Sequence, residues 1–239
     1  MAKPNFIELP DCEPIPILYE DRSVIAIDKP RGWLLVPHSW QKTSRNLQAA
    51  INSSIAGGDF WARSRSLKFL RNVHRLDADT SGILLFAKSP GAVETYSALF
   101  ESRKMEKTYL AVAVGAPKEN EWTCQLKLGQ DSRQFGRIKV DERFGKDAET
   151  HFKILETRGK FSLVEAKPVT GRTHQIRVHL TESGLPIVGD ELYGIMEKDF
   201  PLGLRAVRLA YFDPFTKRRV EIRAPTESFL REFGFKAAH

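Results

Sequence analysis

A short polar cluster holds the residues of this sequence with the clearest potential for chemistry. His74, Arg75 and Asp77 place an imidazole, a guanidinium and a carboxylate within four residues, and the apolar run Ile83–Ala87 follows a Thr-Ser-Gly turn. Such a run is typical of a strand buried on both faces. Polar groups at the end of a buried strand are costly unless they are paired or do chemistry. Asp77 is therefore a candidate catalytic carboxylate. The alternative is a turn in which Asp77 caps backbone amides and Arg75 is its ion partner.

A second polar cluster lies at the start of a predicted helix. Residues three or four apart share a helix face, so His174 and Arg177 lie together while an apolar stripe faces the core. The positive end of the helix favours an anion, either a phosphate or the carboxylate of Asp77. The alternative is an amphipathic helix with a solvated basic side, and we place His179 on that solvated side.

Positive charge is concentrated just before the first cluster. The chain has a net charge of +7 and an isoelectric point near 9.4, which suggests a polyanionic partner. Residues 38–75 hold seven Lys and Arg against one acid, whereas residues 116–150 are neutral. The basic segment also contains Trp40, Phe60 and Trp61, and aromatic side chains among cations suit a single-stranded or looped nucleic acid. A solvated basic face is the alternative.

The sequence argues against several other classes of protein. It has no run of about 18 apolar residues, so we expect no membrane span, and its N-terminus lacks the apolar stretch of a secretory signal. Cys12 and Cys124 are isolated, and the six histidines lack a close metal-binding spacing. No phosphate-binding glycine loop, dinucleotide fingerprint or Gly-x-Ser-x-Gly elbow is present. We therefore expect a cytoplasmic monomer whose chemistry needs neither a metal nor a cofactor.

Short apolar runs predict many strands and few helices. The predicted strands are Val24–Ile27, Ile83–Phe86, Tyr109–Val114, Trp122–Leu128, Gly136–Val140, Thr150–Leu155, Phe161–Ala166, Arg205–Phe212 and Val220–Arg223. The predicted helices are Leu47–Ile55 ending at Gly57-Gly58, one beginning at Ser89-Pro90, Thr173–Ser183 ending at Gly184, and Glu227–Phe233. In Lys107–Val114, alternation places Tyr109 on one face with Ala111 and Ala113. The pattern predicts an α+β fold, a single domain with a mixed, largely antiparallel sheet.

Six motifs in order resemble the RluA-like family of RNA pseudouridine synthases. The sequence HRLDADTSGILLFAK resembles the catalytic motif of that family. The others are DKPRGW (Asp28–Trp33), EKTYLAVAVG (Glu106–Gly115), GKDAETHFKIL (Gly145–Leu155), VTGRTHQIRVHL (Val169–Leu180) and GLPIVGDELYG (Gly184–Gly194). The resemblance runs from about Ile17 to the C-terminus. It implies a catalytic domain over residues 16–239, preceded by a short extension (1–15) and without the accessory N-terminal RNA-binding domain of many relatives.

The resemblance implies isomerisation of uridine to pseudouridine in ribosomal or transfer RNA. Asp77 corresponds to the catalytic aspartate, acting as nucleophile or base at the ribose. Tyr109 corresponds to the tyrosine that packs on the base, and Arg177 to the arginine that pairs with the aspartate. A nearby guanidinium keeps a carboxylate ionised, and the uridine must be flipped or looped out to be reached.

RNA contacts are expected from cationic residues around these three positions. Arg75 would fill the space left by the flipped nucleotide. Further expected contacts are His74, Lys107, Arg172, His174, Arg63 and Arg65, and segment 38–71 is the candidate for selecting the RNA. The sequence departs from many relatives at Leu204-Arg205-Ala206 and Asp213-Pro214. An RNA-binding protein without catalysis, and a glycosidase using Asp77 and Asp79, are the alternatives.

Overall fold

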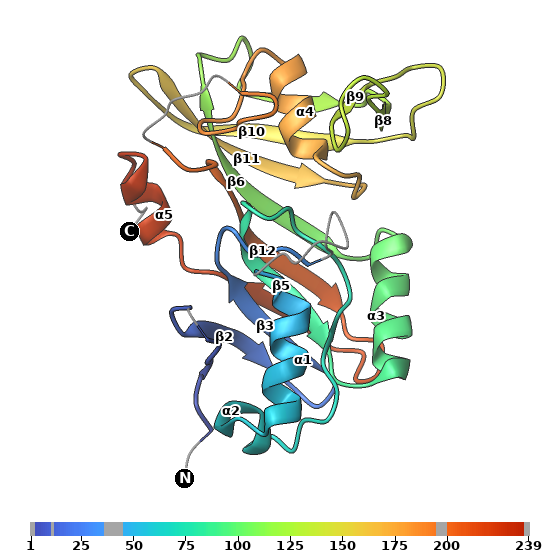
Figure 1. Cartoon of the computed structure of the whole chain (residues 1–239). Helices are drawn as coiled ribbons and strands as arrows, with labels where there is room; N and C mark the ends of the chain where they lie inside the picture. Colours follow the sequence, from blue (N-terminus) through green and yellow to red (C-terminus); the bar gives the residue numbers. More distant parts are fainter. Residues whose placement is uncertain (1–2, 11, 36–44, 195–199, 237–239) are drawn as a thin grey trace. The chain divides into compact units, whose positions relative to one another are not determined.

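The computed structural model describes residues 3–10, 12–35, 45–194 and 200–236 (Figure 1). The chain divides into two compact units, which are described separately. Unit 1 comprises Met1–Met105 and Leu209–Ala224, and unit 2 comprises Glu106–Arg208 and Pro225–His239. Within the described ranges, no helix has both the length and the apolar character needed to cross a membrane.

Unit 1 is built on antiparallel strands arranged around β5, the strand that directly follows the first polar cluster. Strand β5 pairs with β3, β3 with β2, and β2 with β1, while β4 adds to β5. All seven residues of β5 are buried, as the continuous apolar run predicts. The strands are β1 (Phe6–Ile7), β2 (Ile15–Glu20), β3 (Val24–Lys29), β4 (Arg71–Asn72), β5 (Ser81–Ala87) and β13 (Arg219–Arg223).

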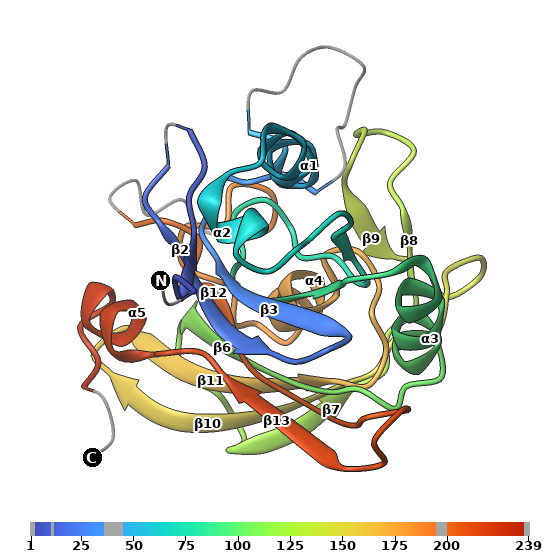
Figure 2. The same cartoon turned by 90° about the horizontal axis from the view of Figure 1, so that it is seen from below.

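Three helices belong to unit 1: α1 (Leu47–Gly57), α2 (Phe60–Arg63) and α3 (Pro90–Glu101). Helix α3 begins where the sequence predicts, because the Ser89 side chain accepts a hydrogen bond from the backbone N–H of Ala92. Its buried Ala92 and Tyr96 join a core cluster with β3 and β5. Helices α1 and α2 lie close together (Figures 1 and 2), and the Trp61 ring N–H donates to the Ser54 hydroxyl at 2.7 Å.

Unit 2 contains a second antiparallel arrangement and a small separate hairpin. Strand β11 pairs with both β6 and β10, and β10 pairs with β7 (Figure 2). Strands β8 and β9 pair only with each other among the named strands of the described ranges. The bounds are β6 (Glu106–Val114), β7 (Glu121–Cys124), β8 (Leu128–Gln130), β9 (Ile138–Val140), β10 (Thr150–Arg158) and β11 (Phe161–Pro168). Strand β12 (Leu204–Phe212) has residues in both units.

The two faces of β6 bury different helices. Ala111 and Ala113 pack in a cluster with α4 (Gln175–Glu182), against which Tyr109 also packs. Leu110 and Val112 pack in a second cluster with α5 (Glu227–Glu232). The predicted alternation along this strand is therefore confirmed, and it places Tyr109 on the side of the sheet that α4 covers.

The predicted α+β class with a mixed, largely antiparallel sheet is confirmed. The single strand expected over Trp122–Leu128 is wrong, because the chain forms β7 and β8 as separate strands. Helix α4 begins at Gln175 rather than Thr173, because His174 has φ of +54° and cannot belong to a right-handed helix. The short helix α2 and the strands β1, β2 and β4 have no counterpart in the prediction. The single catalytic domain over residues 16–239 stays a prediction.

Candidate active site

The loop that carries Asp77 is held in place by a buried lysine. Lys29, at the end of β3, has no exposed surface, and its ammonium donates hydrogen bonds to the carbonyls of Ala78 (2.6 Å), Thr80 (3.0 Å) and Pro30 (3.0 Å). The backbone N–H of Thr80 donates to the carbonyl of Asp77 at 3.2 Å. Lys29 therefore fixes the backbone immediately after Asp77, whose own side chain is half-buried.

Burial makes the Lys29 ammonium unusually acidic. Desolvation lowers its pKa to about 8, against the opposing effect of the Asp79 and Asp77 carboxylates. Lys29 was not among the site residues predicted from the sequence, although it lies in the DKPRGW motif. The signal that could have found it is a lysine two positions after the apolar run Val24–Ile27, since a lysine there is either exposed or buried with partners.

His74 supports the same loop through different elements. Its Nε2 accepts a hydrogen bond from the backbone N–H of Leu85 in β5 at 3.1 Å, and its ring stacks on Phe100 at 4.4 Å between centroids. A nitrogen that accepts from an amide carries no proton, so this imidazole is neutral with its proton on Nδ1. His74 thus ties the loop to β5 and α3, and its predicted RNA contact stays a prediction. The neighbouring Arg75 is exposed.

Lys107 in unit 2 fixes a loop through a backbone carbonyl, as Lys29 does in unit 1. Its ammonium donates to the carbonyl of Thr170 at 2.9 Å and links β6 to the loop that leads into α4. Burial lowers the pKa of Lys107 to about 8. Lys107 and Tyr109 are two residues apart in a strand, so their side chains leave the same face. The expected RNA contact of Lys107 stays a prediction, beside the structural contact that its ammonium makes.

The loop before α4 is organised around the buried amide of Gln175. Its Oε1 accepts from the backbone N–H of Arg172 (3.0 Å) and the hydroxyl of Thr170 (2.6 Å). Its Nε2 donates to the carbonyl of Glu149 and the hydroxyl of Thr150, both at 2.9 Å. One side chain accepts two of these hydrogen bonds and donates the other two, so Gln175 fixes this loop firmly. The exposed Arg172 is thereby left at the surface, where it also donates to a backbone carbonyl.

Arg177 is buried and paired with a carboxylate that was not among the predicted site residues. Its Nε and one Nη donate to the two oxygens of Asp190, both at 2.7 Å. This bidentate geometry fixes the plane of the guanidinium. Asp190 lies in the GLPIVGDELYG motif, thirteen residues beyond Arg177. The pairing of Arg177 with Asp77, which belongs to unit 1, stays a prediction.

Tyr193 lies beside this ion pair and also contacts His174. The Arg177 guanidinium lies 5.1 Å from the centre of the Tyr193 ring, and the Tyr193 hydroxyl is 2.8 Å from Nδ1 of His174. His174 and Arg177 both contact Tyr193 at the start of α4. The shared helix face predicted from their spacing is wrong, because His174 precedes the helix in a left-handed conformation. Tyr109 packs on the apolar cluster to which α4 contributes.

The interpretation of His179 as a solvated histidine is wrong. Its side chain is fully buried, its Nε2 donates to the carbonyl of Leu126 at 3.1 Å, and its Nδ1 lies 3.0 Å from the Thr150 hydroxyl. Burial lowers the pKa of His179, with the Leu126 contact opposing the shift. The histidine is therefore a neutral core residue that joins α4 to β10 and to the chain before β8.

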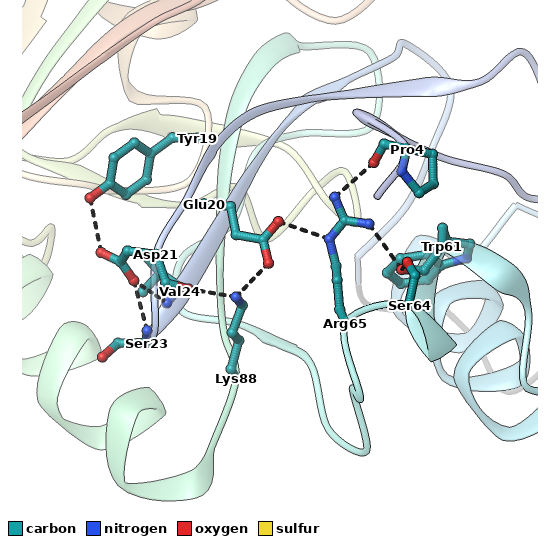
Figure 3. Close-up of polar contacts among 10 residues, drawn as sticks. All are labelled: Pro4, Tyr19, Glu20, Asp21, Ser23, Val24, Trp61, Ser64, Arg65 and Lys88. Carbon is teal, nitrogen blue, oxygen red and sulfur yellow. Dashed lines mark hydrogen bonds and ion pairs between the residues drawn. The ribbon is translucent and has the colours of Figure 1, made fainter. Parts of the chain in front are cut away.

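The prediction that Arg65 contacts RNA does not fit its surroundings. The side chain is only 2% exposed and donates to Glu20 at 2.8 Å and to the carbonyls of Pro4 and Trp61 (Figure 3). Glu20 also pairs with Lys88 at 2.7 Å. Burial alone would raise the pKa of Glu20, but the hydrogen bonds from Lys88 and Arg65 lower it below its ordinary value. Arg65 therefore holds unit 1 together rather than facing a ligand.

The other described residues of the basic segment 38–71 differ in their exposure. Trp61 is fully buried and therefore does not belong to an exposed basic and aromatic surface, whereas Arg63 is exposed and its RNA contact stays a prediction. Trp40 and Lys42 lie outside the described residues. Among the described residues, no group of three or more His, Cys, Asp and Glu side chains is arranged to hold a metal ion.

Comparison with known proteins identifies the family. The model of the RNA pseudouridylate synthase family matches residues 23–182, and the chain belongs to this family. It is an RNA pseudouridine synthase, an isomerase that acts on uridine in RNA.

Individual relatives match most of the chain. The ribosomal large subunit pseudouridine synthase C of Yersinia pestis is 36% identical over 93% of this chain and 68% of its own length. An uncharacterized RNA pseudouridine synthase of Bacillus subtilis is 34% identical over 90% of this chain and 70% of its own length. Among solved structures, human RNA pseudouridylate synthase domain containing 1 aligns with a TM-score of 0.70 at 28% identity, covering 88% of this chain and 83% of that one.

Proposed function

We propose that this enzyme converts uridine to pseudouridine in RNA of the large ribosomal subunit, with Asp77 as its catalytic carboxylate. The RNA class is supported by the names of the relatives from Yersinia pestis and Salmonella typhimurium, both ribosomal large subunit pseudouridine synthases. The target is a uridine in a loop or one that is flipped from a stem, because a stacked and paired base cannot be reached.

The observation that carries the role of Asp77 is the construction of its loop. Buried Lys29 contributes three hydrogen bonds to the carbonyls of Pro30, Ala78 and Thr80, although burying a cation is costly. These contacts fix the backbone that immediately follows Asp77. A rigidly held side chain is what a group attacking one atom of a substrate requires.

The reaction needs no outside reagent. The bond from N1 of uracil to C1′ of the ribose breaks, the uracil turns, and a bond from C5 to C1′ forms. The proton leaves C5 and a proton is added to N1, so atoms and electrons balance. Asp77 acts at the ribose, either by attacking C1′ or by removing a proton. Both roles need an ionised carboxylate.

Tyr109 acts on the uracil base, and Arg177 acts on the negative charge of the Asp77 carboxylate. Tyr109 stacks on the detached uracil, and stacking is worth roughly 1–3 kcal/mol per base, which helps to retain it while it turns. Arg177 stabilises the ionised form of Asp77. Lys107 fixes the loop that leads to Arg177, and its place on the Tyr109 side of β6 suits contact with the flipped nucleotide.

The loop between β8 and β9 and the turn that follows β9 support further RNA contacts, in place of the buried Arg65 and Trp61. Phe135 is 91% exposed and Phe144 is 77% exposed. The Arg143 guanidinium lies 4.9 Å from the ring centre of Phe144, and the Arg133 side chain is also exposed. Exposed aromatic rings beside arginines suit stacking on unpaired bases. We use the name hairpin surface for Arg133 and Phe135 in the loop between β8 and β9 together with Arg143 and Phe144 in the turn after β9.

Two measurements test the function. The purified enzyme should release tritium from large-subunit ribosomal RNA transcripts labelled at C5 of uridine, and should release little from a pool of transfer RNA. Pseudouridine mapping in cells with and without the enzyme should then show the loss of particular sites in the large-subunit RNA. Release from transfer RNA alone would replace the proposed substrate, and no release from either RNA would contradict the proposed activity.

A further inference from the structure

Tyr193 contacts both the hairpin and the residues around Arg177, all within unit 2. Its hydroxyl accepts a hydrogen bond from the backbone N–H of Ile138 in β9 at 2.7 Å and lies 2.8 Å from Nδ1 of His174. Its ring centre lies 5.4 Å from the guanidinium of Arg137 and 5.1 Å from that of Arg177. One side chain thus joins β9 to the start of α4.

Asp190 anchors Tyr193 and Arg177 to the same point. Besides the two hydrogen bonds from Arg177, its Oδ1 accepts from the backbone N–H groups of Leu192 (3.0 Å) and Tyr193 (3.1 Å). The turn is tight, because a Cβ at Gly194 would lie only 2.4 Å from the carbonyl oxygen of Ile187. The carboxylate of Asp190 therefore holds both the backbone of Tyr193 and the guanidinium of Arg177.

The small core beneath the hairpin completes this connection. Leu128 of β8 packs with Val178 of α4, and Ile138, Val140 and Tyr193 pack against them. The hairpin has no partner among the other named strands of the described ranges, and Tyr193 and this cluster attach it to α4, beside the contact of His179 with Leu126 just before β8.

We propose that Tyr193 is a positioning residue that couples the β8–β9 hairpin to Arg177, so that RNA bound by the hairpin sets the orientation of the guanidinium. The inference rests on the proposed role of Arg177 and deepens it. Tyr193 acts as a hydrogen-bonding and stacking group and not as a base, because burial raises its pKa above the ordinary value for tyrosine.

Three variants separate this role from a merely structural one. Tyr193→Phe keeps the ring between the two arginines and removes the hydroxyl, Tyr193→Leu removes the ring as well, and Arg137→Gln removes the hairpin guanidinium. Tyr19→Phe is the matched control, because that hydroxyl contacts Asp21 in unit 1. The readouts are the single-turnover rate at saturating RNA and the RNA dissociation constant.

We expect Tyr193→Phe to slow the single-turnover rate about 5- to 10-fold, in line with the loss of one or two hydrogen bonds, while the dissociation constant changes less than about 2-fold. Arg137→Gln should slow it by a similar factor in the wild-type background but should add nothing to Tyr193→Leu, because both act through the same ring. Multiplying effects in the double variant, or a rate unchanged by Tyr193→Phe, would overturn the proposal.

A second readout does not depend on turnover. The Nε–H signal of Arg177, assigned by its loss in Arg177→Lys, should exchange with solvent at least about 5-fold faster in Tyr193→Phe and Arg137→Gln than in wild type and Tyr19→Phe. Equal exchange rates would overturn the coupling even if the enzyme proved inactive on ribosomal RNA. Absence of turnover in the wild type would count against the proposed function alone.

Discussion

The buried Lys29 offers a perturbation whose size can be worked out from its contacts. Lys29→Met keeps a side chain of similar length and removes the ammonium that holds the carbonyls of Pro30, Ala78 and Thr80. A hydrogen bond to a charged group contributes about 1.5–3 kcal/mol, so three of them are worth about 5–9 kcal/mol. A pKa of about 8 in place of 10.5 means that the folded surroundings as a whole disfavour the ammonium by about 3 kcal/mol, with burial outweighing the Asp79 and Asp77 carboxylates. The net loss in unfolding free energy should therefore be about 2–6 kcal/mol.

The assay measures stability and turnover together. Urea unfolding at pH 7 gives the loss of stability, and single-turnover tritium release, measured where the variant is still folded, reports on the Asp77 loop. We expect the rate to fall at least about 10-fold, because the loop loses its support. Lys88→Met is the matched control, since Lys88 is a mostly buried lysine that pairs with Glu20 and the carbonyl of Asp21. It should lose stability and keep the wild-type rate. Wild-type stability and rate in Lys29→Met would refute the reasoning.

Three further outcomes follow from the contacts described. The pKa of Lys29 is about 8 in the folded protein and near 10.5 in the unfolded chain, so between these pH values the unfolded chain binds more protons. The unfolding free energy of wild type relative to Lys29→Met, measured by urea unfolding, should therefore rise as the pH increases from 8 to 10.5. A difference that falls over this range would contradict the burial of the Lys29 ammonium. Arg65→Met should lower the unfolding free energy by about 2–4 kcal/mol and leave RNA affinity within about 2-fold of wild type in filter binding, whereas a large loss of affinity would restore Arg65 as an RNA contact. The double variant Phe135→Ala, Phe144→Ala should weaken RNA binding by roughly 1–3 kcal/mol per stacked base. Phe212→Ala is the control, because Phe212 in unit 1 is also an exposed ring, with the Arg219 guanidinium 5.9 Å from its centre. Equal losses of affinity in the double variant and the control would remove the hairpin surface from the RNA interface.

Local sequence signals are enough to predict the elements around the site. Ser89 caps α3 and Gly58 ends α1 in a left-handed conformation, and both depend only on neighbouring residues. The alternation along β6 likewise follows from a period of two. It predicts that Tyr109 shares a face with Ala111 and Ala113, and this is the face that α4 covers.

The contacts that support the site could not be predicted, because their partners are distant in the sequence. Lys29 binds carbonyls of residues 49 and 51 positions away, and Arg65 pairs with Glu20 at a separation of 45 positions. An arginine in a basic segment is predicted to be exposed, because the sequence alone does not show which distant carboxylate pairs with it. Arg177 and Asp190 both lie in recognisable motifs, yet only the fold shows that they pair. The solvated position predicted for His179 is wrong for the same reason, since its partners Leu126 and Thr150 lie in distant parts of the sequence.

The role of Asp77 is tested most directly by one comparison of turnover and binding. Wild type and Asp77→Asn are each given large-subunit ribosomal RNA labelled with tritium at C5 of uridine, and tritium release and RNA affinity are both measured. The variant keeps the size of the side chain and loses its charge. We predict no release above background by the variant, with a dissociation constant within about 2-fold of wild type, because the carboxylate acts on the bond and not on affinity. Release at the wild-type rate would contradict the assignment of Asp77 as the catalytic carboxylate, and a large loss of binding would show that Asp77 is structural.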